Sequence, residues 1–357
     1  MHHGKEIYTF FGRYHIFGLL GIIISSSVLG LTINKTLKII FENNINNYND
    51  FIIKLFKGNK YGKKIINIIN IIINIFLLAT FYIMMAGLSS YFKQKYNISN
   101  YITSIVAAFI CYIVLCKNTD GVIKISSICV PIIIIFITLI GGKYFQNSVY
   151  KLTNLKVDSL SDENITVFII FKSIASAVLY SGYNSIILIP VVISLKKNIK
   201  VNNSKIIGIL ISIFLIILGF FVFGILLIGN IQIMQLDMPI AFIIKKFESK
   251  YEFLYGVVLV ISIFTSIISA ELGFLKNCSK NKLQYKRYLK IICISSIFIS
   301  NIGFSKLIDL LYPLFGIFGI ILQFMCLSYL WRVFIICKSY INICYTVQVI
   351  YKIRSEY

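Results

Sequence analysis

The amino-acid sequence predicts an all-α protein that crosses a membrane many times, from its composition, its long apolar runs and the charge of its loops. Of the 357 residues, 58% are hydrophobic and 13% are charged, and the mean hydropathy of +0.86 lies outside the range of soluble domains. Runs such as Ile206 to Ile228 are apolar on every face, whereas the strands of membrane barrels alternate apolar and polar residues. The crossings are therefore helices, and soluble enzymes, secreted disulfide scaffolds and disordered tails are excluded.

Nine apolar runs qualify as spans of a hydrocarbon core that takes about 20 helical residues to cross. In chain order they are Ile16 to Asn34, Ile65 to Phe92, Tyr101 to Cys116, Val122 to Gly142, Ile165 to Leu195, Ile206 to Asn230, Phe253 to Leu275, Tyr288 to Phe304 and Ile308 to Leu330. The segment Val333 to Ile350 carries polar residues and favours an amphipathic helix over a tenth crossing. We expect a single transmembrane domain over residues 1–357, with a cytoplasmic tail from 333 to 357.

The net charge of +22 lies in short loops between the spans, so it indicates membrane orientation and predicts no nucleic-acid partner. The loops Glu42 to Lys64, Lys196 to Lys205 and Lys276 to Arg287 are rich in lysine, and the last two contain no acidic residue. Alternate threading of the nine spans puts all three loops on one side, which we expect to be cytoplasmic. The loops Lys143 to Glu163 and Ile231 to Glu252 carry acidic residues and fall on the other side.

Cysteine and histidine spacing predicts no metal site. The eight cysteines form no C-x-x-C pair and lie in or beside apolar runs, so we interpret them as free thiols. The three histidines, His2, His3 and His15, lack a regular ligand spacing.

The span Ile165 to Leu195 would be about 45 Å long as one straight helix, which exceeds the hydrocarbon core. Its centre holds the polar cluster Tyr180 to Asn184, and Pro190 follows within about two turns. We expect two half-helices that meet near Ser181 to Asn184, since transporters bind substrates and ions at such breaks. The alternative is a glycine that permits close helix packing, together with a simple proline kink.

Several short motifs, in order, resemble the YkvI-like bacterial membrane proteins. Those motifs are Gly4-Lys5-Glu6-Ile7, Phe10-Phe11-Gly12, Gly18 to Gly21 with Ser25, Phe81 to Gly87, Ser181-Gly182-Tyr183-Asn184 with Pro190-Val191, and Pro313-Leu314-Phe315-Gly316. The family is uncharacterised in substrate and resembles a distant branch of the amino acid, polyamine and organocation transporters. The resemblance covers nearly the whole chain.

This resemblance implies a LeuT-like fold of two inverted five-helix repeats, whose first and sixth helices are broken at the binding site. Ile165 to Leu195 would be the sixth helix, Phe253 to Leu275 the eighth, and Gly4 to Tyr14 the outer half of the first. Related chains carry an apolar half-helix before the G-x-E motif, where this sequence has Met1-His2-His3. The inner half of the first helix is therefore expected to be missing, through a late start assignment or in an inactive, decayed paralogue.

The predicted substrate-binding residues are the polar and small ones that this mapping brings to the helix breaks and to the third helix. They are Gly4, Glu6, Tyr82, Gly87, Ser181, Gly182, Tyr183 and Asn184. Glu6 would accept a proton or an amine, and the hydroxyl, amide and free backbone groups of Ser181 to Asn184 would face a small polar solute. A solvated Glu6 and simple aromatic packing of Tyr82 are the alternatives.

For ion coupling, the resemblance implies that hydroxyls on the eighth helix ligate sodium together with carbonyls of the first helix. The matching residues are Thr265, Ser266 and Ser269, although such hydroxyls also commonly bond to their own helix. Lys172, about two turns into its span, is expected to replace a coupling ion or to pair with a carboxylate across the bundle. Glu271 lies near a span end, where we interpret it as a snorkelling side chain.

The functional hypothesis is a secondary transporter of a small organic solute, an amino acid or organic cation, in the cytoplasmic membrane of a bacterium. Sodium or a proton would be the coupling ion, and no cofactor is expected. The alternative is a non-transporting sensor or scaffold subunit, or an inactive paralogue, with the same fold. An enzyme is not expected, because the sequence has no H-E-x-x-H or G-x-S-x-G motif and no intramembrane Asp pair.

Overall fold

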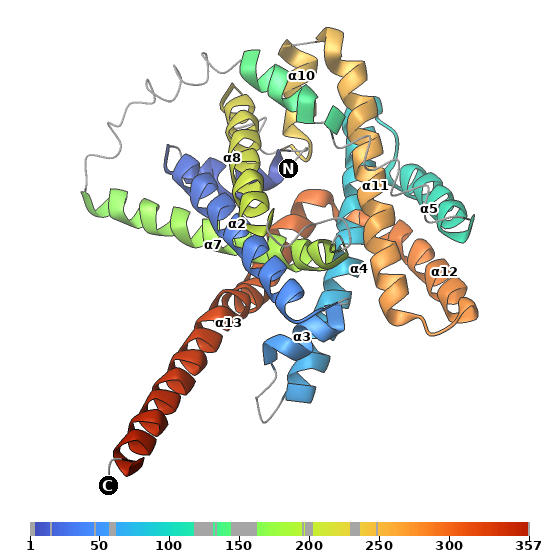
Figure 1. The fold of residues 1–357 in the computed structure, drawn as a ribbon. Helices are drawn as coiled ribbons and strands as arrows, with labels where there is room; N and C mark the ends of the chain where they lie inside the picture. Colours follow the sequence, from blue (N-terminus) through green and yellow to red (C-terminus); the bar gives the residue numbers. More distant parts are fainter. Residues whose placement is uncertain are drawn as a thin grey trace.

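A computed structural model shows an all-α membrane protein and confirms the predicted fold class (Figure 1). It describes residues 4–14, 16–45, 48–56, 62–117, 131–132, 134–143, 163–194, 196, 203–228, 236–247 and 249–355, and contains no strand in these ranges. The α-helices are α1 Lys5–Phe10, α2 Ile16–Glu42, α3 Tyr48–Phe56, α4 Gly62–Tyr96, α5 Asn100–Lys117, α7 Glu163–Ser194, α8 Ser204–Ile228, α10 Pro239–Phe247, α11 Glu252–Cys278, α12 Lys282–Ile299 and α13 Phe304–Ser355.

Six helices of the described residues are long and apolar enough to cross a membrane. They are Ile16–Glu42, Ile66–Tyr96, Val167–Pro190, Ser204–Leu226, Ser249–Cys278 and Phe304–Tyr329, and each matches a predicted span. Asn100–Cys116 and Ile134–Lys143 are shorter apolar helices that match two further predictions, although residues 118–130 of that region lie outside the described part. The ninth predicted span, Tyr288 to Phe304, overlaps α12.

Local sequence signals explain two of the helix boundaries. The side chain of Asn281 accepts a hydrogen bond of 2.8 Å from the backbone N–H of Gln284, which caps the start of α12. The side chain of Gln284 in turn accepts from the backbone N–H of Lys280 at 3.0 Å. Gly303 separates α12 and its short 3₁₀ extension from α13 with a φ of 104°, which residues other than glycine rarely adopt.

The helices pack as two groups. In one group α7 packs against α13 and α2, and α2 packs against α8; in the other, α4 packs against α11 and α5, and α12 packs against α5 and α11. Figure 1 shows the first group beside the second, and contacts of α4 with α13 join the two. The short α1 contacts the first group through α7, α8 and α13.

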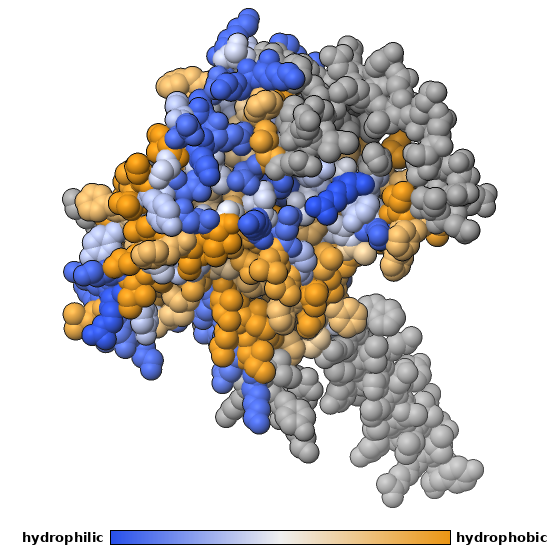
Figure 2. Space-filling model, turned by 180° about the vertical axis from the view of Figure 1, so that it is seen from behind, coloured by the Kyte–Doolittle hydropathy of each residue, from blue (hydrophilic) through white to orange (hydrophobic). Residues whose placement is uncertain are grey.

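Large apolar side chains are exposed along the outer faces of these helices. Examples are Leu139, Phe171, Ile209, Phe253 and Phe324, all at least 60% exposed. Figure 2 shows broad apolar areas on one face of the molecule. Apolar surface of this extent is typical of a protein that lipid tails surround, so the chain contacts the bilayer directly.

Helix α7 corrects the prediction of two half-helices, because it is continuous from Glu163 to Ser194 and includes Pro190. At Gly182 a Cβ atom would overlap the backbone carbonyl of Gly316, and at Gly319 it would overlap the carbonyl of Gly182. Glycines therefore allow α7 and α13 to approach at backbone distance. The alternative interpretation of Gly182, a glycine that permits close helix packing, is therefore correct.

Described parts of two predicted cytoplasmic loops lie side by side. Tyr48 and Asn49 of α3 line a cavity of about 260 Å³ together with Lys276 and Asn277 at the end of α11. At the start of α8, Gly208 lies against Gly30 in the second half of α2. Residues 57–61 and 197–202 of these loops lie outside the described part of the chain.

The C-terminal region forms one helix with the last span. The sequence predicts a separate amphipathic helix over Val333 to Ile350, but α13 runs from Phe304 to Ser355 without interruption. Figure 1 shows this extension leaving the bundle on the side of α3. The cytoplasmic location of residues 333–357 stays a prediction.

Candidate functional site

The candidate site is built around α1, a six-residue helix buried between longer ones. Gly4 precedes it with a φ of 76°, and its carbonyl accepts a hydrogen bond of 3.0 Å from the N–H of Tyr8. At the other end, the hydroxyl of Ser176 on α7 donates to the carbonyl of Phe10 at 2.6 Å, and the hydroxyl of Ser173 donates to the carbonyl of Phe17, in the first turn of α2, at 2.7 Å. The first bond satisfies a carbonyl at the end of α1, and together the two bonds hold α1 and the start of α2 against α7.

Glu6 is the central residue of this site. Its side chain is only 6% exposed, and each of its oxygens accepts a hydrogen bond from a tyrosine. The hydroxyl of Tyr183 on α7 donates to Oε2 at 3.0 Å, and the hydroxyl of Tyr312 on α13 donates to Oε1 at 3.0 Å. Three segments that are far apart in the sequence therefore meet at one carboxylate. We call the group of Glu6, Tyr183 and Tyr312 the Glu6 clamp.

Aromatic rings surround the Glu6 clamp. The rings of Tyr183 and Tyr312 stack with centroids 4.6 Å apart, and Phe10 stacks on the other side of Tyr183 at 5.6 Å. Tyr180 meets Tyr183 edge-on at 5.3 Å, and its buried hydroxyl has no hydrogen-bond partner among the described residues. A buried carboxylate is a strong partner for an organic ammonium group, and the unpartnered Tyr180 hydroxyl is a further polar group next to these rings.

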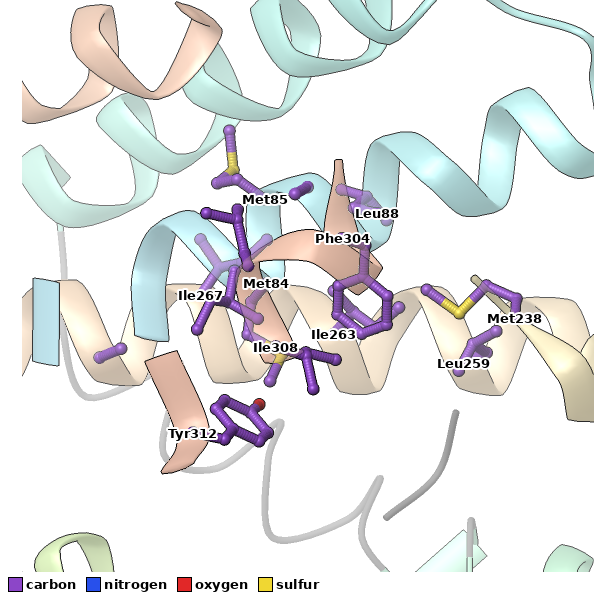
Figure 3. Close-up of a cluster of buried hydrophobic side chains, with 14 of the residues drawn as sticks. Met84, Met85, Leu88, Met238, Leu259, Ile263, Ile267, Phe304, Ile308 and Tyr312 are labelled. Carbon is purple, nitrogen blue, oxygen red and sulfur yellow. The ribbon is translucent and has the colours of Figure 1, made fainter. Parts of the chain in front are cut away.

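Tyr312 connects the Glu6 clamp to the second helix group. Figure 3 shows Tyr312 near Ile308 of α13, in the same buried apolar cluster as Met84 of α4 and Ile267 of α11. Nearby, Phe76 of α4 meets Phe315 of α13 edge-on at 4.7 Å. A movement of one helix group against the other would therefore act on this side of the clamp.

Of the predicted substrate-binding residues, Gly4, Glu6 and Tyr183 belong to this site. Ser181 donates to the side chain of Gln323 at 3.1 Å, and Gln323 donates to Thr32 and Ser185 at 3.0 Å each, which ties α7, α13 and α2 together. The side chain of Asn184 donates to the carbonyl of Tyr180 in its own helix at 2.9 Å, and Gly182 packs against α13. Ser181 and Gly182 therefore hold helices together in this structure, whereas Asn184 bonds within α7.

Tyr82 and Gly87 of α4 lie apart from the Glu6 clamp. The hydroxyl of Tyr82 shares a hydrogen bond of 2.7 Å with Ser295 of α12. A Cβ at Gly87 would lie 3.0 Å from the ring of Phe304, so this glycine makes room for an aromatic side chain. Helix packing therefore explains both positions. For Tyr82, packing was the alternative interpretation of the sequence.

The hydroxyls predicted to ligate sodium are bonded within α11. Thr265 and Ser266 both donate to the carbonyl of Ser262 at 2.9 Å, and Ser269, which is exposed, donates to the carbonyl of Thr265 at 2.7 Å. The hydroxyls of these three residues therefore bond to carbonyls of their own helix, which was the alternative interpretation. They do not form a cation site in this structure.

Two charged residues differ from their predictions. Lys172 is exposed on the outer face of α7, with its ammonium 4.2 Å from the ring centroid of Phe168, so the prediction of a coupling cation inside the bundle is wrong. Glu271 is 1% exposed, so the snorkelling interpretation is also wrong. Both errors have one cause, because the sequence of an apolar helix does not show which face meets lipid.

Sequence reasoning did not identify Tyr312, Tyr180 or Phe10 as site residues. Tyr312 directly precedes the Pro313 to Gly316 motif, and Phe10 begins the Phe10-Phe11-Gly12 motif, so the motifs marked both neighbourhoods. Among the described residues, no group of three or more His, Cys, Asp or Glu side chains is placed to hold a metal ion.

Comparisons with known proteins support the resemblance at the level of a membrane protein. No protein-family model matches this sequence. The chain is similar to the uncharacterized membrane protein YkvI of Bacillus subtilis (strain 168), with 24% identity over 323 residues. The alignment covers 88% of this chain and 86% of YkvI.

Proposed function

We propose that this protein is a secondary transporter of a small organic solute that carries an amine, and that Glu6 anchors the amine. The observation that supports this most is the Glu6 clamp, a carboxylate buried in a membrane protein and held by two tyrosines from different helices. Intramembrane carboxylates are costly to bury and usually mark solute or ion pathways. Amino acids and organic cations are the amine-bearing solute classes that such a carboxylate would bind.

The arrangement of the helices supports movement around this site. α1 is short, is followed by a 3₁₀ turn and packs on α7, α8 and α13, whereas Tyr312 belongs to an apolar cluster with residues of α4 and α11. Alternating access would then come from one helix group rocking against the other, with α1 moving between them. This mechanism does not require a break in α7.

The other parts of the proposal follow from the sequence. The protein would lie in the cytoplasmic membrane of a bacterium, perform no covalent chemistry and need no cofactor. Either sodium or a proton would be the coupling ion. A LeuT-like arrangement of inverted repeats is the fold that the family resemblance implies for such a transporter.

Purified protein in lipid vesicles tests this proposal. Vesicles are offered radiolabelled proteinogenic amino acids and simple alkylamines, one at a time, under an imposed sodium or proton gradient. We expect gradient-driven accumulation of at least one amine-bearing compound above the level of protein-free vesicles. No accumulation of any compound under either gradient would contradict the proposal and favour the sensor or scaffold alternative.

A further inference from the structure

A second buried carboxylate lies in the other helix group. Glu271 on α11 is 1% exposed, and its two oxygens face thiols from two neighbouring helices. Cys111 on α5 donates to Oε2 at 2.9 Å, and Cys293 on α12 donates to Oε1 at 3.5 Å. Three helices thus converge on one acidic side chain that the solute site does not use.

The surroundings of Glu271 contain few groups that would stabilise a negative charge. Thiols are weak hydrogen-bond donors, and no lysine or arginine of the described residues forms an ion pair with this carboxylate. Two further titratable groups lie within electrostatic range of Glu271, the phenols of Tyr82 on α4 and Tyr285 on α12. Tyr82 is bonded to Ser295, and Tyr285 donates to the carbonyl of Leu115 at 3.4 Å.

A neutral carboxylic acid fits this environment better than a carboxylate does. An ionised carboxylate in a low-dielectric interior needs strong donors or a cation, and neither is present here among the described residues. A neutral acid carries its proton on one oxygen and still accepts a thiol hydrogen bond on the other. The geometry therefore favours a proton on Glu271 in this conformation.

We propose that Glu271 is the proton-binding residue that couples solute movement to the proton gradient. In this conformation the carboxylic acid holds the proton away from water. When α11 and its neighbours move, water reaches the side chain, the O–H bond breaks, the proton passes to water and a carboxylate remains. The carboxylate takes up a proton from the other side in the next cycle. This inference rests on the proposed function and names its coupling ion.

The two carboxylates then have separate roles in separate helix groups. Glu6 has two phenol donors, which favour its charged form and a solute cation, whereas Glu271 is buried with only two weakly donating thiols, which stabilise a negative charge poorly. Ser269, the predicted sodium-site residue nearest to Glu271, is exposed and bonded within its own helix. Glu271 is therefore a buried acidic group that can carry a proton. Ser269 is not placed to bind a sodium ion inside the protein.

Infrared spectroscopy of the full chain in lipid nanodiscs tests the proton directly, without any solute. We expect the wild type at neutral pH to show the C=O stretch of a protonated carboxylic acid, the Glu271→Gln variant to lack it, and the Glu6→Gln variant to retain it. The Cys111→Ser and Cys293→Ser variants add stronger donors, so the band should disappear at lower pH than in the wild type. A wild-type spectrum without a band that depends on Glu271 would overturn the inference.

The transport assay tests the coupling separately. Uptake of the amino acids and alkylamines is measured with and without an inward proton gradient, and the gradient should stimulate the wild type but not Glu271→Gln. Equal stimulation of both would overturn the inference even if the infrared band is present. Failure of the wild type to take up any compound would contradict the proposed function instead, and the infrared spectra would still decide whether Glu271 holds a proton.

Discussion

At Glu6, two hydroxyls 3.0 Å from the carboxylate oxygens offset part of the cost of burying a negative charge. Hydrogen bonds to charged groups contribute about 1.5–3 kcal/mol each, and a buried acceptor that loses its donor incurs the desolvation cost. The tyrosine rings also form the walls of the site. Loss of one hydroxyl should therefore weaken the site without removing the ring.

The first prediction concerns these two tyrosines. Tyr183→Phe and Tyr312→Phe should each weaken apparent solute affinity, by about 1–3 kcal/mol, because the carboxylate that positions the amine loses a donor. Uptake kinetics in vesicles measure the change. Tyr91→Phe is the matched control, since it removes a hydroxyl from α4 near Lys95, away from the Glu6 clamp, and should leave affinity unchanged. Equal effects of all three substitutions would show that the clamp has no special role.

The sequence identified Glu6 and Tyr183 because both lie in short motifs with polar residues in apolar surroundings. It did not identify Tyr312, which lies 306 positions from Glu6 and meets it only through the packing of α13 on α7 and α1. It placed Lys172 inside and Glu271 near water, because composition alone does not show which face of a transmembrane helix is buried. Burial depends on neighbouring helices.

At the scale of the helix, the contact between α7 and α13 depends on residues without side chains. Gly182 of α7 faces Gly316 and Gly319 of α13, so the two backbones touch. The length of Ile165 to Leu195 predicted a break, but a long helix also fits a membrane protein when it tilts or projects beyond the hydrocarbon core. Length and a polar centre therefore did not distinguish a break from a packing site.

The second prediction follows from this contact. Gly182→Ala should lower the thermal stability of the purified protein in detergent, because the added methyl group overlaps the carbonyl of Gly316 and pushes α7 from α13. The expected cost is about 1–3 kcal/mol. Gly273→Ala on α11 is the control, since its Cβ would lie 3.4 Å from Leu77, an ordinary contact. If Gly182→Ala were as stable as Gly273→Ala, the helices would not touch at this point.

At the scale of the whole molecule, hydropathy and loop charge predicted much of the architecture. Six predicted spans match the long apolar helices of the described residues, and described parts of two lysine-rich loops line one cavity. The short α3 and α10 were not predicted, because each has only nine residues and lies within a loop. The pairing of helices into two groups was also beyond prediction, since it depends on contacts between residues far apart in the chain.

The third prediction tests orientation through the two ends of α11. In a variant without other cysteines, Cys278 should react with a membrane-impermeant thiol reagent only after the cells are permeabilised, because its end of α11 joins the lysine-rich side. A cysteine at Lys250, just before the other end of α11, should react in intact cells. The reverse pattern would invert the topology.

The role of Glu6 as the anchor of a solute amine is the central claim, and binding to Glu6→Gln tests it most directly. Glutamine keeps the size of the side chain but removes its charge. Equilibrium binding of the amine-bearing compound that the wild type accumulates should weaken by about 2–5 kcal/mol in Glu6→Gln, the scale for loss of one partner of a buried charge pair. Wild-type affinity in a correctly folded Glu6→Gln variant would contradict the account.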